Sequence, residues 1–325
     1  MARILIIRFS ALGDVAMTIP VIHSLAVQYP QHEITVLSRA VWQPLFQGLP
    51  TNVGFVGADL TGKHKGLWGL NSLYSELKAM HFDYIADFHH VLRSKYLCLR
   101  FRLANKPVAS ICKGRAGKKK LVRRHDKVME NQKSSFRRYA DVLEKLGLPV
   151  LLNFSSIYGE GKGNFAEIEP VTGPKEDQKW IGIAPFAKHM GKIYPIELQE
   201  QVVAHFATDP KVKVFLFGGG KSEQEVFDGW VAKYPTVVSM IGKLNMRTEL
   251  NLMSHLDVML SMDSANMHFA SLVGTRVLSV WGATHIYTGF YGYRQRPGGD
   301  LCLGSYSSLC RVYGMETVAG QYGTA

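Results

Sequence analysis

The sequence predicts an α/β protein whose two domains each contain a parallel sheet. Its 325 residues exceed the usual size of one domain, so two domains of roughly 150 residues are expected. Short, β-branched apolar runs alternate with stretches of helical periodicity, which is typical of parallel strands joined by helices. The alternation stops once, in a segment rich in Gly, Pro, Glu and Thr, and then resumes. We therefore place one domain at 1–160, a linker at about 160–174 and a second domain at 175–325.

The first half opens with the apolar run RILIIR at residues 3–8, which has the composition of a strand buried on both faces. The turn FSALGD follows, and apolar residues then recur at helical spacing from 15 to 28. A later helical pattern, FRRYADVLEKL, ends at Gly147, a residue that often terminates helices. By the same criteria we predict strands at 33–37, 52–56, 84–87 and 107–111 and helices at 70–80, 91–103 and 136–146.

The second half repeats this pattern, and one of its strands ends in three glycines. We predict strands at 180–184, 212–217, 236–240, 258–261 and 276–281 and helices at 196–208, 222–233, 247–254 and 265–273. Ligands of such sheets bind beyond the carboxyl ends of the strands. The residues that follow each strand are therefore the first candidates for a functional site.

Composition excludes several classes of protein. Hydrophobic residues at 46% and charged residues at 20% indicate an ordinary globular protein. No pair of the four cysteines has CxxC spacing, which excludes a zinc ribbon and a disulfide scaffold. Charged residues interrupt the apolar N-terminus, so we expect no signal peptide, and no apolar run approaches the ~18–20 residues that span a bilayer. We expect a cytoplasmic protein.

The positive charge is concentrated in one segment. Residues 93–138 contain 16 Lys or Arg and two acids, a net charge of +14, whereas the whole chain carries +12. The rest of the chain therefore carries −2. We expect an anionic partner to bind this segment, although for any single residue a solvated surface charge is an equally good interpretation.

Two motifs follow predicted strands and carry candidate chemical groups. The turn at residues 9–14 offers small residues, which allow a substrate to approach the backbone, and the carboxylate of Asp14. The segment SMDSANMH at 261–268 places hydroxyl and backbone N–H groups at a helix start, which suits a phosphate. Both motifs also fit simple helix capping by Asp14, Asp263 or Ser264, and His268 fits a core position.

Two further motifs are weaker alone. Residues 185–195 supply Lys188 and Lys192 after another strand, yet loop lysines are commonly just solvated. The glycines at 218–220, with Glu223 and Glu225 beyond them, lack the GxGxxG spacing of a dinucleotide site.

Together, in this order, the motifs resemble those of glycosyltransferase family 9, the ADP-heptose:lipopolysaccharide heptosyltransferases. The resemblance rests on RILIIRFSALGDVAMTIP, on Lys192 before a Tyr-Pro, and on ELNLMSHLDVMLSMDS leading into MDSANMHFASLVGTRVLSVWGAT. It implies the GT-B architecture, two Rossmann-like domains facing across a cleft. The first domain would bind the acceptor and the second the nucleotide sugar.

The resemblance also implies roles for individual residues. Asp14 matches the proposed general base and Lys192 the phosphate-binding lysine, and these are our catalytic candidates. Glu223 is the best match for the acid that binds ribose, with Glu225 as the alternative. The other donor-binding candidates are Lys188, Asp263, Ser264, Ala265, Asn266 and His268. The acceptor-binding candidates are Ser10, Ala11, Gly13, Lys118, Lys119, Lys120, Arg123 and Arg124. The chain departs from the family at Ala265, where Gly is usual, and at Lys188, where a small hydroxyl residue is usual.

These assignments lead to an expected reaction. No DxD motif occurs, so we expect an inverting transfer that needs no metal and no cofactor beyond the nucleotide sugar, ADP-heptose. The acceptor would be an anionic glycolipid of the lipid A/Kdo type. We expect a monomer bound peripherally to the inner membrane through the basic segment.

Three alternatives stay open. The protein could use another nucleotide sugar on the same scaffold, as a transferase or an epimerase. It could be a non-catalytic protein that binds anions or nucleic acid. Residues 113–133 contain no Phe, Trp or Tyr for base stacking, so we expect no nucleic-acid partner. The alanine at position 265 also leaves a pseudo-enzyme possible.

Overall fold

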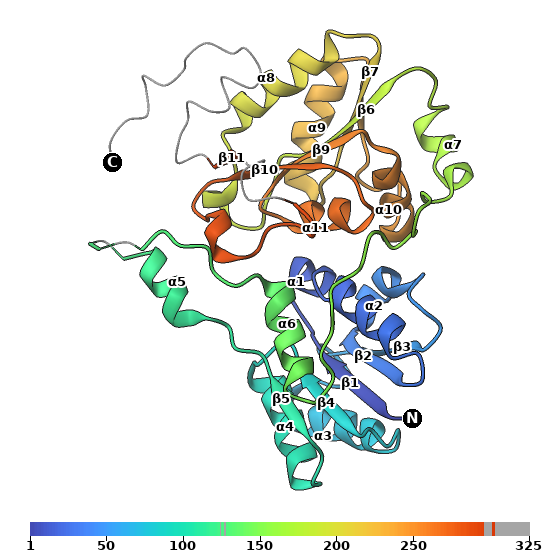
Figure 1. The fold of residues 1–325 in the computed structure, drawn as a ribbon. Coiled ribbons are helices and arrows are strands. Elements are labelled where there is room, and N and C mark those ends of the chain that lie inside the picture. The colour runs from blue at the N-terminus through green and yellow to red at the C-terminus, as the bar shows by residue number, and fades with distance from the viewer. Residues whose placement is uncertain (124, 127, 296–300, 303–325) are drawn as a thin grey trace. The chain divides into compact units, whose positions relative to one another are not determined.

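The computed structural model describes residues 1–123, 125–126, 128–295 and 301–302, the last pair as backbone only (Figure 1). The chain divides into two compact units, Met1–Glu160 and Gly161–Ala325. Each unit is built around one parallel sheet covered by helices on both faces. The predicted α/β class is confirmed.

The first sheet has the strand order β3-β2-β1-β4-β5, and all its pairs are parallel. Its strands are β1 (Arg3–Ile7), β2 (Glu33–Arg39), β3 (Val53–Ala58), β4 (Tyr84–Asp87) and β5 (Val108–Ser110). Strand β1 lies in the middle, where Leu5 pairs with Thr35 on one side and with Ile85 on the other. Residues 4–7 are fully buried, which explains the unbroken apolar run in the sequence.

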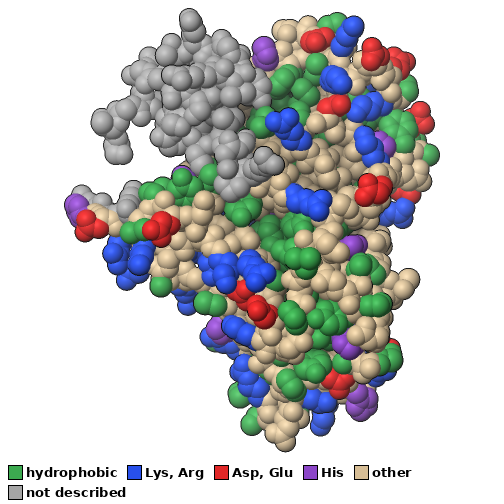
Figure 2. Space-filling model, viewed as in Figure 1, with side chains coloured by type: hydrophobic (Ala, Val, Ile, Leu, Met, Phe, Trp, Pro, Cys, Tyr) green, Lys and Arg blue, Asp and Glu red, His purple; other side chains and the backbone are tan. Residues whose placement is uncertain are grey.

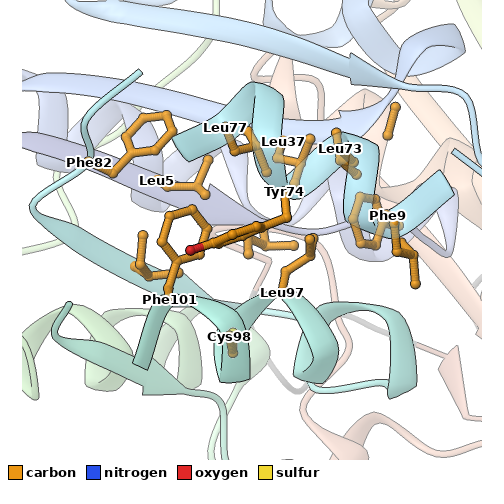
Figure 3. Close-up of a cluster of buried hydrophobic side chains, with 14 of the residues drawn as sticks. Leu5, Phe9, Leu37, Leu73, Tyr74, Leu77, Phe82, Leu97, Cys98 and Phe101 are labelled. Atoms are coloured by element: carbon orange, nitrogen blue, oxygen red, sulfur yellow. The ribbon is translucent and has the colours of Figure 1, made fainter. Parts of the chain in front are cut away.

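Helices α3 and α4 cover one face of this sheet. Leu73 and Leu77 of α3 pack with Leu97 and Phe101 of α4 against Leu5 of β1 (Figure 3). Helices α2 and α6 contact each other and cover the opposite face. The helices of this unit are α1 (Leu12–Ala16), α2 (Ile19–Gln28), η1 (Ala40–Phe46), α3 (Gly66–Lys78), α4 (Leu92–Leu103), α5 (Arg115–Leu121) and α6 (Ser135–Glu144).

One predicted helix of this unit is wrong in detail. The stretch 15–28 contains the end of α1 and, after a break, α2. Pro20 lies in the first turn of α2, where its missing N–H costs nothing, but it could not continue a helix that began at Val15. Sequence periodicity also missed η1 and the short, lysine-rich α5.

The second sheet has the order β11-β10-β9-β6-β7-β8, again with parallel pairs throughout. This is the strand order of a doubly wound, Rossmann-like domain. Its strands are β6 (Lys179–Ala184), β7 (Val212–Leu216), β8 (Val237–Ser239), β9 (Val258–Met262), β10 (Val277–Trp281) and β11 (Leu301–Cys302). Its helices are η2 (Phe165–Glu167), α7 (Glu169–Thr172), η3 (Met190–Lys192), α8 (Ile196–Ala207), α9 (Lys221–Lys233), α10 (Met246–His255), α11 (Ala265–Leu272) and η4 (Ile286–Thr288).

The segment expected as a linker contains η2 and α7 and packs within the second unit. The Gly163 N–H donates to the Ser254 hydroxyl at 2.8 Å, and the Phe165 ring lies against those of Trp180 and His255. In the part of the chain that the structure describes, no helix has both the length and the apolarity that crossing a membrane would need.

Two leucines of α4 allow a matched test of the hydrophobic core of the first unit. Leu97 is fully buried between α4 and the sheet, whereas Leu99 lies two residues further along the same helix and is exposed. We expect Leu97→Ala to lower the free energy of unfolding by about 3 kcal/mol, because it leaves a cavity. Leu99→Ala should change it by less than about 0.5 kcal/mol. Urea denaturation followed by circular dichroism measures both, and equal effects would contradict this packing of α4.

Candidate active site

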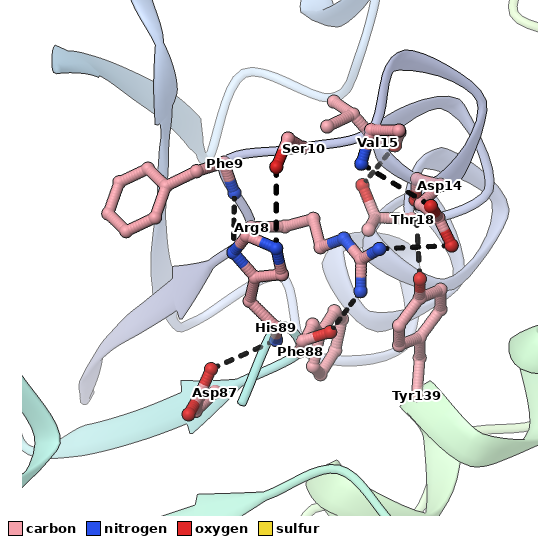
Figure 4. Close-up of polar contacts among 11 residues, drawn as sticks. Arg8, Phe9, Ser10, Asp14, Val15, Thr18, Asp87, Phe88, His89 and Tyr139 are labelled. Carbon is pink, nitrogen blue, oxygen red and sulfur yellow. Dashed lines mark hydrogen bonds and ion pairs between the residues drawn. The ribbon is translucent and has the colours of Figure 1, made fainter. Parts of the chain in front are cut away.

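In the first unit, a charged pair lies where the strand order reverses, between β1 and β4. Connections from these two strands leave toward opposite faces, so the sheet edge is open there. Arg8 directly follows β1, and its Nη2 lies 2.9 Å from Oδ1 of Asp14 (Figure 4). Its Nη1 donates to the Phe88 carbonyl, just beyond β4, at 2.7 Å. Arg8 therefore ties the candidate base to both strands.

Asp14 is held by its neighbours yet remains accessible. It occupies the first turn of α1, where its Oδ2 accepts from the Ala11 N–H at 3.3 Å. The Tyr139 hydroxyl of α6 donates to the Asp14 backbone carbonyl at 3.3 Å. The Asp14 side chain is 27% exposed, against 8% for Arg8. A carboxylate that its neighbours hold in one orientation, and that solvent can still reach, can accept a proton from a bound hydroxyl.

Sequence reasoning missed His89, which supports the turn that precedes Asp14. Its Nδ1 accepts from the Phe9 N–H at 3.4 Å, and its Nε2 lies 3.5 Å from the Ser10 hydroxyl. Burial, helped by the positive charge of Arg8, lowers the pKa of His89 to about 3, so the ring is neutral near pH 7. Of the acceptor candidates, Ser10 and Ala11 are in this turn, Gly13 is in the first turn of α1, and Ala11 is exposed.

The signal that could have found His89 is Asp87, a carboxylate at the end of a predicted strand. Asp87 is fully buried, and its Oδ1 accepts from the backbone N–H groups of His89 and His90 at 2.9 and 2.8 Å. Its Oδ2 accepts from the Ser94 hydroxyl at 3.1 Å. A buried carboxylate with three donors fixes the backbone after β4, and with it the His89 ring.

Cationic side chains of the basic segment face the same site. Burial and the charge of Arg138 lower the pKa of Lys118 to about 8, while Asp14 acts in the opposite direction. Burial also lowers the pKa of Lys113, as does the charge of Arg8. Next to them is a pocket of about 430 Å³ whose lining includes Lys95, Lys113 and Arg115. Of the other basic candidates, Lys119, Lys120 and Arg123 are exposed, and Arg124 lies outside the described residues.

In the second unit, a second charged pair lies at the corresponding reversal, between β6 and β9. Lys192 Nζ lies 2.7 Å from Oδ2 of Asp263, which follows β9 directly. The Thr284 hydroxyl donates to the same oxygen at 2.7 Å. The Ala283 N–H donates to the Gly191 carbonyl at 2.6 Å, which fastens the lysine loop to the end of β10. Thr284, like Arg8 and His89, is a residue of the site that sequence reasoning missed.

The remaining donor candidates of this motif surround the start of α11. Ser264 is the N-cap of α11, but its hydroxyl does not accept a capping hydrogen bond from the helix backbone. It lies 3.3 Å from the hydroxyl of Ser261. Ala265 and Asn266 begin the helix and are half-buried, whereas His268 is buried one turn in. The free N–H groups of a helix start and the ammonium of Lys192 together suit a phosphate. Lys188 is exposed in the same loop as Lys192.

Glu223 and Glu225 have different surroundings. Glu223 Oε2 accepts from the Gly219 N–H at 2.7 Å, so this carboxylate braces the glycine turn at the start of α9. Glu225 lines a pocket of about 420 Å³ together with Lys221 and Gln224. Among the described residues, no group of three His, Cys, Asp or Glu is arranged to hold a metal ion.

Comparison with known proteins identifies the family. The model of glycosyltransferase family 9 (heptosyltransferase) matches residues 70–297. The chain belongs to glycosyltransferase family 9. It is 26% identical, over 285 residues, to the lipopolysaccharide core heptosyltransferase OpsX of Haemophilus influenzae, covering 85% of this chain and 78% of OpsX. The family resemblance noted in the motifs is thereby confirmed.

Two solved structures show the same fold. Heptosyltransferase WaaC of E. coli, solved with ADP, has a TM-score of 0.68 at 15% identity, with 92% of each chain covered. The family 9 glycosyltransferase of Veillonella parvula has a TM-score of 0.72 at 19% identity, covering 93% of this chain and 86% of that one. This chain therefore has the GT-B fold of the family, with two Rossmann-like domains. Membership in a glycosyltransferase family favours an enzyme over a nucleic-acid-binding protein.

The electrostatic link between Lys118 and Asp14 has a measurable consequence. Because Asp14 raises the pKa of Lys118 against the lowering by burial, Asp14→Asn should move the Lys118 titration from about pH 8 to lower pH. Titration of ¹³C-labelled lysine side chains by NMR measures this, with Lys118→Arg assigning the signal. Asp141→Asn removes an α6 carboxylate that pairs with Lys133, and it should leave the Lys118 titration unchanged. An equal shift of the Lys118 pKa in Asp14→Asn and Asp141→Asn would contradict a specific interaction between Lys118 and Asp14.

Proposed function

We propose that the chain is an inverting heptosyltransferase that moves a heptose from ADP-heptose to a lipopolysaccharide inner-core acceptor. The observation that carries the proposal is the pair of charged sites at the strand-order reversals. One offers an accessible carboxylate, Asp14, and the other an ammonium, Lys192, beside a helix start. The names of OpsX, a lipopolysaccharide core enzyme, and of WaaC, solved with ADP, support this choice of acceptor and donor.

Asp14 would act as the general base. It takes the proton of the acceptor hydroxyl while that oxygen attacks the anomeric carbon of the heptose. The bond from the anomeric carbon to the diphosphate oxygen breaks on the opposite side, so the sugar configuration inverts and ADP leaves. Arg8 holds the carboxylate in place throughout, and the neutral His89 ring keeps the Ser10 turn in position.

The second unit would stabilise the departing diphosphate. Negative charge grows on its oxygens in the transition state, and preorganised donors stabilise that charge most effectively. Lys192 and the N–H groups at the start of α11 supply such donors without a metal ion, which agrees with the lack of a DxD motif. Ala265 adds one methyl group where the family usually has Gly, so the phosphate would lie slightly further from this backbone. Glu223, which accepts from the Gly219 N–H, would bind the ribose, with Glu225, which lines a pocket, as the alternative.

The basic segment would recognise the acceptor. A lipid A/Kdo-type glycolipid carries phosphates and carboxylates, which complement Lys113, Lys118 and the exposed cations of α5. Such an acceptor lies in a membrane leaflet, so we propose a cytoplasmic enzyme that binds the inner membrane peripherally. Each basic residue near an anionic surface contributes about 1 kcal/mol to that binding.

A panel of donors tests the reaction class. Purified protein is incubated with ADP-heptose and with UDP- and GDP-sugars, each with and without EDTA, and release of the nucleoside diphosphate is measured. We expect turnover with ADP-heptose that EDTA leaves unchanged, and an inverted linkage in the product by NMR. Turnover of another donor would select the alternative transferase, and strict loss of activity in EDTA would contradict the metal-free mechanism. Nucleotide binding without turnover would indicate a pseudo-enzyme.

Substitution of Asp14 tests the base. We expect Asp14→Asn to lower kcat by about 10²- to 10⁴-fold, the usual contribution of general-base catalysis. Affinity for ADP should stay the same, since the nucleotide site is assigned to the other unit. Asp141→Asn is the matched control, a carboxylate of the same unit that forms a surface pair with Lys133. Retention of full activity in Asp14→Asn would remove Asp14 from the mechanism.

A further inference from the structure

Helix α4 exposes a straight row of leucines to solvent. Leu92 is 86% exposed, Leu99 53% and Leu103 74%. Their spacings of seven and four residues place all three on one face of a helix. The opposite face carries Leu97, Cys98 and Phe101, which are buried against the sheet (Figure 3). The leucine row therefore contributes nothing to the core of the first unit.

Cations flank this leucine row. Arg93, Lys95 and Arg102 are exposed on the same helix, and none of them forms an ion pair within the described part of the chain. The chain contains no Asp or Glu between Asp87 and Asp126. Figure 2 shows Lys and Arg side chains over the lower left of the view, where α4 and α5 lie in Figure 1. The solvent-facing side of α4 thus has an apolar stripe with positive charges on both sides of it.

The neighbouring helix α3 also exposes apolar side chains. Arg100 of α4 bonds to Asn71 of α3, and both helices cover the same sheet face. In the first turn of α3, Leu67 is 64% exposed and Trp68 is 89% exposed. Tryptophan is enriched where membranes meet water, because its ring is apolar and its N–H is polar.

We propose that the outer face of α4, with the first turn of α3, lies in the headgroup region of an anionic phospholipid bilayer. An apolar stripe bordered by Lys and Arg is the pattern of helices that lie in the plane of a membrane surface. A second copy of this chain is disfavoured as the occupant, since two such faces would bring cations against cations. The surface is a convex helix rather than a groove, which fits a flat and deformable partner.

This surface deepens the membrane part of the proposed function. Lys95 borders the leucine row and also lines the pocket that contains Lys113 and Arg115. A bilayer in contact with α4 would therefore bring its headgroups to the mouth of that cationic pocket. The inference rests on the proposed function only in taking the acceptor to be a membrane glycolipid.

Vesicle sedimentation with the full chain tests the surface. The probes are vesicles of phosphatidylcholine mixed with phosphatidylglycerol, and vesicles of phosphatidylcholine alone. We expect the triple variant Leu92→Ser, Leu99→Ser, Leu103→Ser to lower the partition coefficient for the anionic vesicles by about tenfold or more. The variant Arg93→Gln, Lys95→Gln, Arg102→Gln should lower it as well and should weaken its dependence on salt.

A matched control uses apolar side chains exposed elsewhere on the first unit. Val27 is 47% exposed on α2, on the other face of the sheet, and Leu151 is 77% exposed. Val27→Ser with Leu151→Ser should leave vesicle binding unchanged. Unchanged binding in the leucine variant, or a wild-type dimer that this variant converts to a monomer, would overturn the proposal. Donor hydrolysis by the leucine variant should equal that of the wild type. Measuring donor hydrolysis beside vesicle binding therefore distinguishes an error in the proposed reaction from an error in the proposed membrane surface.

Discussion

Every strand pair described in both sheets is parallel, and this constraint determines where the candidate functional groups lie. A parallel neighbour cannot be reached by a tight turn, so the chain returns across one face of the sheet before each new strand. All carboxyl ends then share one edge of the sheet. Where the strand order reverses, the connections diverge and leave that edge open. Asp14 lies at one such reversal and Asp263, with Lys192, at the other.

The open edge is rigid because buried polar groups support it. Asp87 is fully buried and accepts three hydrogen bonds, and removing it would leave the turn after β4 without its partners. That turn carries the Phe88 carbonyl, which accepts from Arg8, and the His89 ring, which supports the turn after β1. The position of the Asp14 carboxylate thus depends on residues more than 70 positions away in the chain.

This dependence explains what the sequence could and could not predict. Local patterns located the described strands of both sheets, apart from β11, because buried parallel strands are short apolar runs. They missed the break before α2, which depends on one proline. They placed Asp14, Lys192 and Asp263 at strand ends, yet the partners Arg8, His89 and Thr284 are defined by contacts across the fold. No local pattern records which distant residue a side chain will meet.

The cations of the basic segment fall into two groups that differ in burial. Lys113 and Lys118 are partly desolvated and feel the charge of Asp14, and a low dielectric there would strengthen their interaction with an anion. Arg93 and Lys95 remain in water on α4, where salt screens them and where they act as a charged border to an apolar stripe. The net charge of +14 does not distinguish these two groups, because a segment whose cations were all equally exposed would carry the same charge. Burial thus separates the cations that we propose to bind an acceptor from those that we propose to face a membrane surface.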